Sequence, residues 1–157
     1  MTKPLHQILD LLDMPPVWLA LHVAVVWVLS LVSPPLSGWL GERLGATLVG
    51  FGVILALGAV AQMALARTTV IPRQAPSSLV TTGLFAWSRN PIYLADGIML
   101  LGAILWLDAV LALPLVAVFV WLIQTRFIKD EEARLTMAFG PEFDLWAART
   151  RRWIGRR

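Results

Sequence analysis

The chain has 157 residues, of which 58% are hydrophobic and 15% charged, and its formal net charge is +3. Soluble globular domains are nearer half apolar and a quarter charged, so the composition indicates a single-domain integral membrane protein rather than a soluble one. The sequence contains no cysteine and only two histidines, which excludes disulfides, thiolate metal sites and a histidine-rich metal centre. We therefore expect neither a metal nor a nucleic-acid partner.

Two long apolar runs come first in the chain, at residues 15–32 and 44–66. A membrane-spanning helix needs roughly 20 apolar residues, with a range of about 17–25, so each run predicts one span. The sequence Ser33-Pro34-Pro35 between them predicts a turn. Gly52, in the second run, would let another helix approach closely.

A third apolar block covers residues 91–127. As one helix it would reach roughly 55 Å, which is far more than the ~30 Å hydrocarbon core of a bilayer. Asp108 carries the only charge in the middle of the block, so we expect a tight turn there between helices at 91–107 and 109–127. The predicted fold is therefore all-α, with four membrane spans including a C-terminal helical hairpin.

The distribution of charge predicts the topology. The loop at 67–90 holds three arginines and no acid, and the tail from Arg126 onward holds eight basic residues. Cytoplasmic loops carry the Lys/Arg excess, so we expect both termini in the cytoplasm. Tryptophans would then mark the two interfaces, with Trp39 and Trp106 at the far side and Trp87, Trp146 and Trp153 at the near side.

The stretch WSRNPIYLADG, residues 87–97, gathers polar chemistry at the cytoplasmic start of the third span. Asn90 and Pro91 are favoured at a helix start, whose free N–H groups attract anions, and Arg89 adds a planar donor for them. Tyr93 and Asp96 follow on one helix face. An acid inside a membrane helix is costly unless it has a partner. The alternative is that Arg89 only anchors the chain and Tyr93 only lies in the interface.

A second polar cluster, in residues 127–143, continues the last span. Glu131 and Glu132 open an amphipathic helix that ends near Gly140, and residues 142–154 predict a second amphipathic helix on the membrane surface. The alternative is that the two glutamates form a solvated pair that balances nearby basic residues. The helical spacing places four residues on one face: Gln124, Ile128, Glu131 and Leu135.

Taken together, SRNPIY at 88–93 and EEARLTMAFG at 131–140 resemble the isoprenylcysteine carboxyl methyltransferase family, which is similar to the membrane phospholipid N-methyltransferases. The preceding LVTTGLFAW at 79–87 also resembles this family, so the resemblance covers about residues 67–154. The family pattern commonly has histidine after the arginine, where this chain has Asn90. We expect asparagine to cap the helix equally well.

The resemblance implies methyl transfer from S-adenosylmethionine to a lipid-borne acceptor at the membrane, with a cofactor region at about 79–154. The acceptor is either a prenylcysteine-type carboxylate or a phospholipid amine. The implied catalytic residues are Arg89, Tyr93 and Glu131. The implied cofactor-binding residues are Trp87, Asn90, Pro91, Tyr93, Asp96, Glu131, Glu132, Leu135 and Phe139.

Two other functions fit the same residues. The C-terminal part of membrane sterol reductases resembles this region and binds NADPH, but the chain has no dinucleotide glycine fingerprint. A non-enzymatic four-helix scaffold or transport subunit would need none of the motif residues. Neutralising Arg89, Asp96 and Glu131 would leave such a protein functional.

Overall fold

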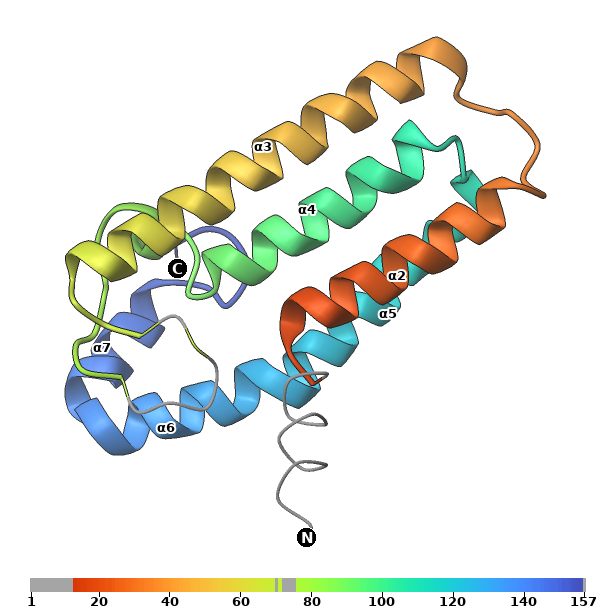
Figure 1. Ribbon diagram of the computed structural model, residues 1–157. Helices are drawn as coiled ribbons and strands as arrows, with labels where there is room; N and C mark the ends of the chain where they lie inside the picture. The colour runs from red at the N-terminus through yellow and green to blue at the C-terminus, as the bar shows by residue number, and fades with distance from the viewer. Residues whose placement is uncertain (1–12, 70, 72–75, 157) are drawn as a thin grey trace, which may run out of the picture.

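The computed structural model describes residues 13–69, 71 and 76–156, and the regular elements in these residues are helices (Figure 1). The prediction of an all-α fold is therefore confirmed for this part of the chain. In chain order the elements are α2 (Pro15–Ser30), α3 (Gly38–Leu65), the 3₁₀ turn η1 (Gly83–Ala86), α4 (Pro91–Trp106), the 3₁₀ turn η2 (Val110–Ala112), α5 (Pro114–Ile123), the π-helical turn η3 (Gln124–Ile128), α6 (Lys129–Phe139) and α7 (Pro141–Arg149).

Two helical stretches among the described residues are long and apolar enough to cross a membrane. They are Gly38–Leu65, with a hydropathy of 2.2, and the continuous stretch Val110–Phe139, with a hydropathy of 1.9. The helices α2 and α4 are also apolar but have 16 residues each. These two stretches agree with the membrane character predicted from composition, whereas the number of spans stays a prediction.

Helix α3 has small residues on its inner face and large apolar residues on its outer face. Gly45 and Gly52 are buried against α4, while Ile54 is 71% exposed. An added Cβ at Gly45 would lie 2.5 Å from the carbonyl oxygen of Gly102, and one at Gly52 would lie 3.0 Å from that of Ala95. The close approach predicted for Gly52 is therefore confirmed, and the outward apolar face suits contact with lipid.

The turn predicted at Asp108 is present, and its carboxylate also caps α3. Oδ1 accepts hydrogen bonds from the Leu36 and Ser37 N–H groups and from the Ser37 hydroxyl, at 3.2, 2.9 and 2.6 Å. Oδ2 accepts one from the Gly38 N–H at 3.2 Å. The hydrogen bond from the Ser37 hydroxyl is the largest cause that lowers the pKa of Asp108 below its usual range. The acid thus ties the α4–α5 turn to the start of α3.

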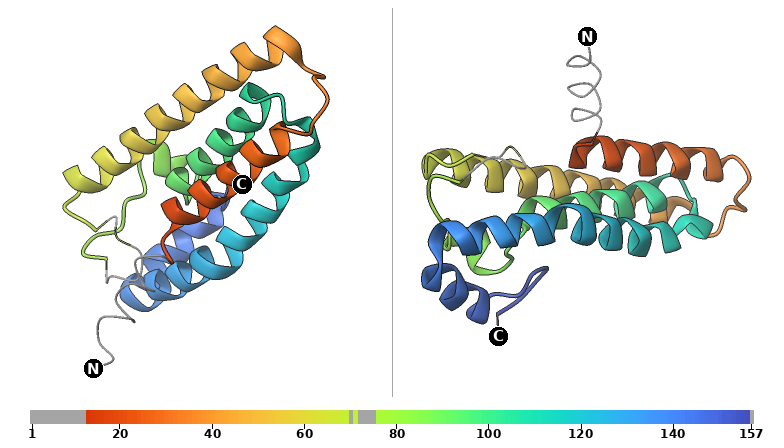
Figure 2. Two further views of the ribbon diagram at one scale, coloured as in Figure 1. Left: turned by 45° about the vertical axis from the view of Figure 1, so that its right-hand side comes forward. Right: turned by 90° about the horizontal axis from the view of Figure 1, so that it is seen from below.

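Different loops and helices meet at the two ends of the helix bundle (Figure 2). The α2–α3 loop and the α4–α5 turn meet at one end, where Asp108 bonds to residues 36–38. The end of α3, the start of α4, and helices α6 and α7 gather at the other end (Figures 1 and 2). The first motif (SRNPIY, 88–93), at the start of α4, and the second motif (EEARLTMAFG, 131–140), in α6, therefore lie at the same end of the bundle.

Several element boundaries differ from those predicted. Helix α3 begins at Gly38 rather than near residue 44, because Asp108 satisfies the N–H groups of its first residues. The stretch 109–127 is not one regular helix, because a 3₁₀ turn precedes Pro114 and a π turn follows Ile123. The second amphipathic helix ends at Arg149 and does not continue to 154.

The predicted placement of Trp146 at the membrane interface is wrong. Its side chain is 8% exposed and lies in an apolar cluster with Phe85 and Phe143. The indole N–H donates to the Phe85 carbonyl at 3.0 Å, so the polar end of the ring is satisfied inside the protein. Trp39, by contrast, is 68% exposed and remains free to face an interface.

Candidate functional site

The first motif places its polar residues at the start of α4. The predicted helix start at Asn90-Pro91 is confirmed, with Asn90 at the N-cap position and Pro91 as the first helical residue. The predicted side-chain cap is wrong, because the Asn90 side chain makes no capping hydrogen bond. Its amide instead donates to the carbonyl of Arg152 at 3.0 Å, while the Ser88 hydroxyl accepts the Asn90 backbone N–H at 3.1 Å. The asparagine therefore joins the helix start to the C-terminal segment, residues 150–156.

The π turn at Gln124–Ile128 decides which side chains of the last helix face α4. It adds a residue to one turn, so residues before and after it no longer share the face predicted by regular helical spacing. Gln124 accepts a hydrogen bond from the Trp153 indole at 3.1 Å. Glu131 instead accepts one from the Tyr93 hydroxyl at 2.7 Å. The two motifs predicted from sequence thus meet directly at Tyr93 and Glu131.

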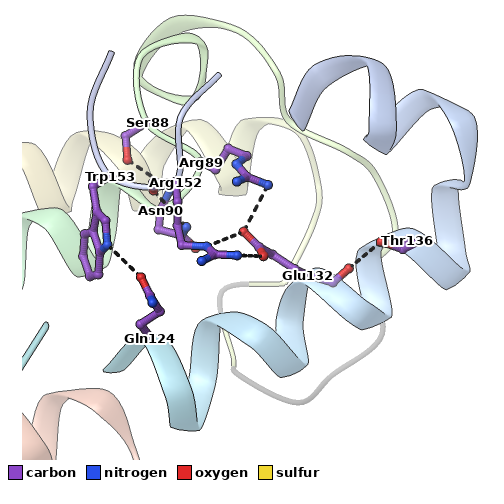
Figure 3. A network of polar contacts seen from close by, with 8 residues as sticks. All are labelled: Ser88, Arg89, Asn90, Gln124, Glu132, Thr136, Arg152 and Trp153. Atoms are coloured by element: carbon purple, nitrogen blue, oxygen red, sulfur yellow. Dashed lines mark hydrogen bonds and ion pairs between the residues drawn. The ribbon is translucent and has the colours of Figure 1, made fainter. Parts of the chain in front are cut away.

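The neighbouring Glu132 points to different partners (Figure 3). Its Oε1 lies 3.0 Å from Nε of Arg152 and 3.1 Å from Nη1 of Arg89, and its Oε2 lies 2.5 Å from Nη2 of Arg152. The hydrogen bonds to Glu132 raise the pKa of the Arg152 guanidinium. One carboxylate therefore joins the first motif, the second motif and the C-terminal segment.

A cavity of about 390 Å³ lies between these elements. Its apolar wall comes from the starts of α2 and α4, the end of α3 and the segment 76–80, together with Phe85 and Trp146. Four charged side chains also line it: Arg89, Asp96, Glu131 and Arg134. Ligand sites usually have volumes of about 300–1,000 Å³ and mostly apolar walls with a few polar groups, so this cavity has the size and lining of a ligand site.

Asp96 and Arg134 each have side-chain polar atoms without a hydrogen-bond partner among the described residues. Asp96 is 6% exposed, and no hydrogen bond or ion pair joins its carboxylate to the described residues. Nη1 of Arg134 is buried and lacks a hydrogen-bond partner within the same residues. A buried carboxylate such as that of Asp96 is unfavourable as a charged group unless a cation pairs with it. The cavity thus offers one group for a ligand cation and one for a ligand anion.

The structure divides the residues predicted as the site into two groups. Three of them do not line the cavity: Trp87, Glu132 and Phe139. The Trp87 side chain is 60% exposed, and the guanidinium carbon of Arg156 lies 5.3 Å from the centroid of its ring. The others share the cavity wall: Arg89, Asn90, Pro91, Tyr93, Asp96, Glu131 and Leu135.

Three residues at the site were missed by the sequence analysis. Arg134 follows Glu131 by three positions, so helical spacing could have placed it on the same face. Trp146 lines the cavity, but its sequence context resembles that of an interfacial tryptophan. Arg152 lies in a run of arginines near the C-terminus, so the sequence does not distinguish it from Arg151. Only the folded structure shows that Arg152 contacts Glu132.

Comparison with known proteins gives one family match. The family described as phospholipid methyltransferase matches residues 41–142, which is well over half of the chain and includes α4, α5, α6 and the first motif. Neither the curated proteins nor the solved structures give a match. The matched region ends just before Phe143, so it contains both motifs but not the C-terminal segment.

Proposed function

The chain belongs to the phospholipid methyltransferase family, and on this premise we propose that it transfers a methyl group from S-adenosylmethionine to a lipid-borne acceptor at the cytoplasmic face of a membrane. The observation that carries this proposal is the cavity, because it brings the charged residues of both motifs to one space beside apolar helices. The family is one of membrane methyltransferases. It therefore favours this function over a scaffold or a reductase-like enzyme.

The residues of the cavity fit the proposed cofactor in charge and shape. S-adenosylmethionine, when bound, supplies an electrophilic methyl group on a sulfonium, so the protein has to position groups rather than provide a strong base. Arg89, at the positive end of α4, suits the cofactor carboxylate. Glu131, held by the Tyr93 hydroxyl at 2.7 Å, suits the ammonium or a ribose hydroxyl. The Trp146 indole offers an aromatic surface for the adenine.

We favour an amine over a carboxylate as the acceptor. Asp96 lies one turn or more inside α4, lines the cavity and has no cationic partner among the described residues. An acceptor amine would supply that partner, and the carboxylate would take the proton that the amine loses on methylation. A carboxylate acceptor would instead be repelled by Asp96 and Glu131.

The acceptor's hydrocarbon tail has a route from the bilayer in this proposal. The start of α2, at Pro15 and Pro16, and the end of α3, at Val60 and Met63, both line the cavity. These residues belong to two apolar helices. A lipid tail between α2 and α3 would keep contact with apolar side chains while its head group entered the charged part of the cavity.

The proposed topology has four spans with both termini in the cytoplasm. The basic loop and tail support it, as does the gathering of the α2–α3 loop and the α4–α5 turn at the opposite end (Figure 2). A membrane-impermeant thiol reagent should label Ser77→Cys only from the cytoplasmic side and Leu36→Cys only from the other side. Labelling of both from one side would exclude this arrangement.

The reaction is tested with purified protein in lipid nanodiscs and radiolabelled cofactor. We expect label to enter an aminophospholipid but not a prenylated cysteine. Asp96→Asn should reduce this transfer at least about tenfold while retaining S-adenosylhomocysteine binding. Asp144→Asn, at an exposed acid on α7, serves as the control and should be silent. Transfer only to the prenylated cysteine would exclude the amine, and binding of NADPH but not of S-adenosylhomocysteine would exclude the methyltransferase.

A further inference from the structure

The C-terminal segment 150–156 folds back over the first motif instead of continuing α7. The Arg89 N–H donates to the Arg151 carbonyl at 3.1 Å, and the Gly155 N–H donates to the Trp87 carbonyl at 2.8 Å. A single antiparallel bridge joins Thr150 to Arg156 and closes the segment on itself. These backbone hydrogen bonds place the side chain of residue 152 beside α6.

At that position Arg152 forms a two-point contact with Glu132. Nε and Nη2 of the guanidinium lie 3.0 and 2.5 Å from the two carboxylate oxygens, and Nη1 of Arg89 lies 3.1 Å from Oε1 (Figure 3). Planar two-point pairs of this kind are among the strongest and most directional side-chain contacts. Both oxygens of Glu132 are therefore engaged, and neither Glu132 nor Arg152 lines the cavity.

The arrangement constrains the side chain of Arg89, which lines the cavity. The Arg89 side chain is 11% exposed, and Glu132 contacts one of its nitrogens. If Arg152 were lost, the carboxylate of Glu132 could turn and pair with Arg89 at two points. The Arg89 guanidinium would then move toward α6 and away from the cavity.

We propose that Arg152 is a positioning residue: by engaging both oxygens of Glu132, it holds the Arg89 guanidinium against the cavity for an anionic group of the ligand. This inference rests on the proposed function, because the ligand anion is taken to be the cofactor carboxylate. Backbone hydrogen bonds between the segment and residues Trp87 and Arg89 hold the segment in place without the Arg152 side chain. The side chain can therefore be changed while the segment stays docked.

The experiment measures S-adenosylhomocysteine binding by calorimetry on the full-length protein in detergent. Arg152→Gln removes the charge, and Arg152→Lys keeps the charge but loses the planar two-point contact. Arg151→Gln is the matched control, because this exposed neighbour forms no ion pair with the described residues. Thermal midpoints and the binding stoichiometry are recorded for every variant.

We expect the dissociation constant to rise about tenfold in Arg152→Gln, less in Arg152→Lys, and not at all in Arg151→Gln. Adding Glu132→Gln to Arg152→Gln should cause little further loss, because the two side chains act as one unit. A purely structural role would lower the stoichiometry and the thermal midpoint but leave the dissociation constant of the folded fraction unchanged. That result would overturn the positioning role. Fully additive losses of affinity from Arg152→Gln and Glu132→Gln would also overturn it.

The failure of the proposed function has a different signature. If wild-type protein shows no S-adenosylhomocysteine binding, the methyltransferase proposal is overturned and this inference with it. If wild-type protein binds and Arg152→Gln binds equally well, the proposed function stands and only the role of Arg152 is overturned.

Discussion

The hydrogen bond between Tyr93 and Glu131 can be removed almost without changing the shape of the protein. Tyr93 is the only tyrosine of the chain. Its ring is 7% exposed and packs against Phe127, with 6.5 Å between the ring centroids. Tyr93→Phe keeps this ring and removes only the hydroxyl, which donates to Glu131 at 2.7 Å. The variant therefore measures the contribution of the Tyr93 hydroxyl at the point where the two motifs meet.

A hydrogen bond to a charged group contributes about 1.5–3 kcal/mol, which corresponds to a factor of roughly 10 to 150. If Tyr93 holds Glu131 in place for the cofactor, most of this energy should be lost from methyl transfer. We expect kcat/KM for radiolabelled transfer into extracted lipid to fall at least about tenfold. The thermal midpoint should change little, because the buried ring remains.

The double variant makes the test sharper. Glu131→Gln should also reduce transfer, and Tyr93→Phe should add little to that loss, because the two groups act through the same contact. Wild-type activity in Tyr93→Phe would refute a catalytic role for the hydroxyl. Fully additive losses would show that the two side chains act separately in spite of their 2.7 Å contact.

Two further predictions concern the scaffold that positions the site. Gly102→Ala should destabilise the protein by about 1–3 kcal/mol, because the new methyl would lie 2.8 Å from backbone atoms of Gly45 and Val49; Gly97→Ala, on the same helix with nothing within 4 Å, should leave the thermal midpoint unchanged or raised. Asp108→Asn should lower the thermal midpoint at neutral pH and should make this midpoint fall less steeply as the pH is lowered. Folding lowers the pKa of Asp108. Its contribution to the stability of the folded protein is therefore full above the unfolded-state pKa of about 3.9 and is lost as the pH falls through the folded-state pKa. An unchanged pH profile would exclude Asp108 as the cap of α3.

Local sequence signals were sufficient for the parts of the fold that depend on neighbouring residues. Asn90-Pro91 predicted the start of α4, and Asp108 predicted the turn after it; both are confirmed. Asp108 has a φ of +49°, which Asp and Asn adopt more readily than most residues. The family resemblance was likewise carried by two short motifs and agrees with the match over residues 41–142.

The parts that could not be predicted depend on contacts between distant segments. The start of α3 at Gly38 depends on Asp108, which lies 70 residues later in the chain. The end of α7 at Arg149 depends on hydrogen bonds between the tail and residues 87–89. The π turn at Gln124–Ile128 has no proline or glycine to mark it. Periodicity and propensity describe a helix by itself, so they give no information on these contacts.

The paired glutamates of the second motif illustrate the same limit. Consecutive residues on a helix point about 100° apart, so Glu131 and Glu132 face different neighbours. In the fold Glu131 faces Tyr93 and the cavity, whereas Glu132 faces Arg152 and Arg89 behind it. A pair that reads as two equivalent acids in the sequence thus divides into one residue that can contact the ligand and one that holds the arginine beside it. Loss of the first should remove a contact, while loss of the second should misplace one.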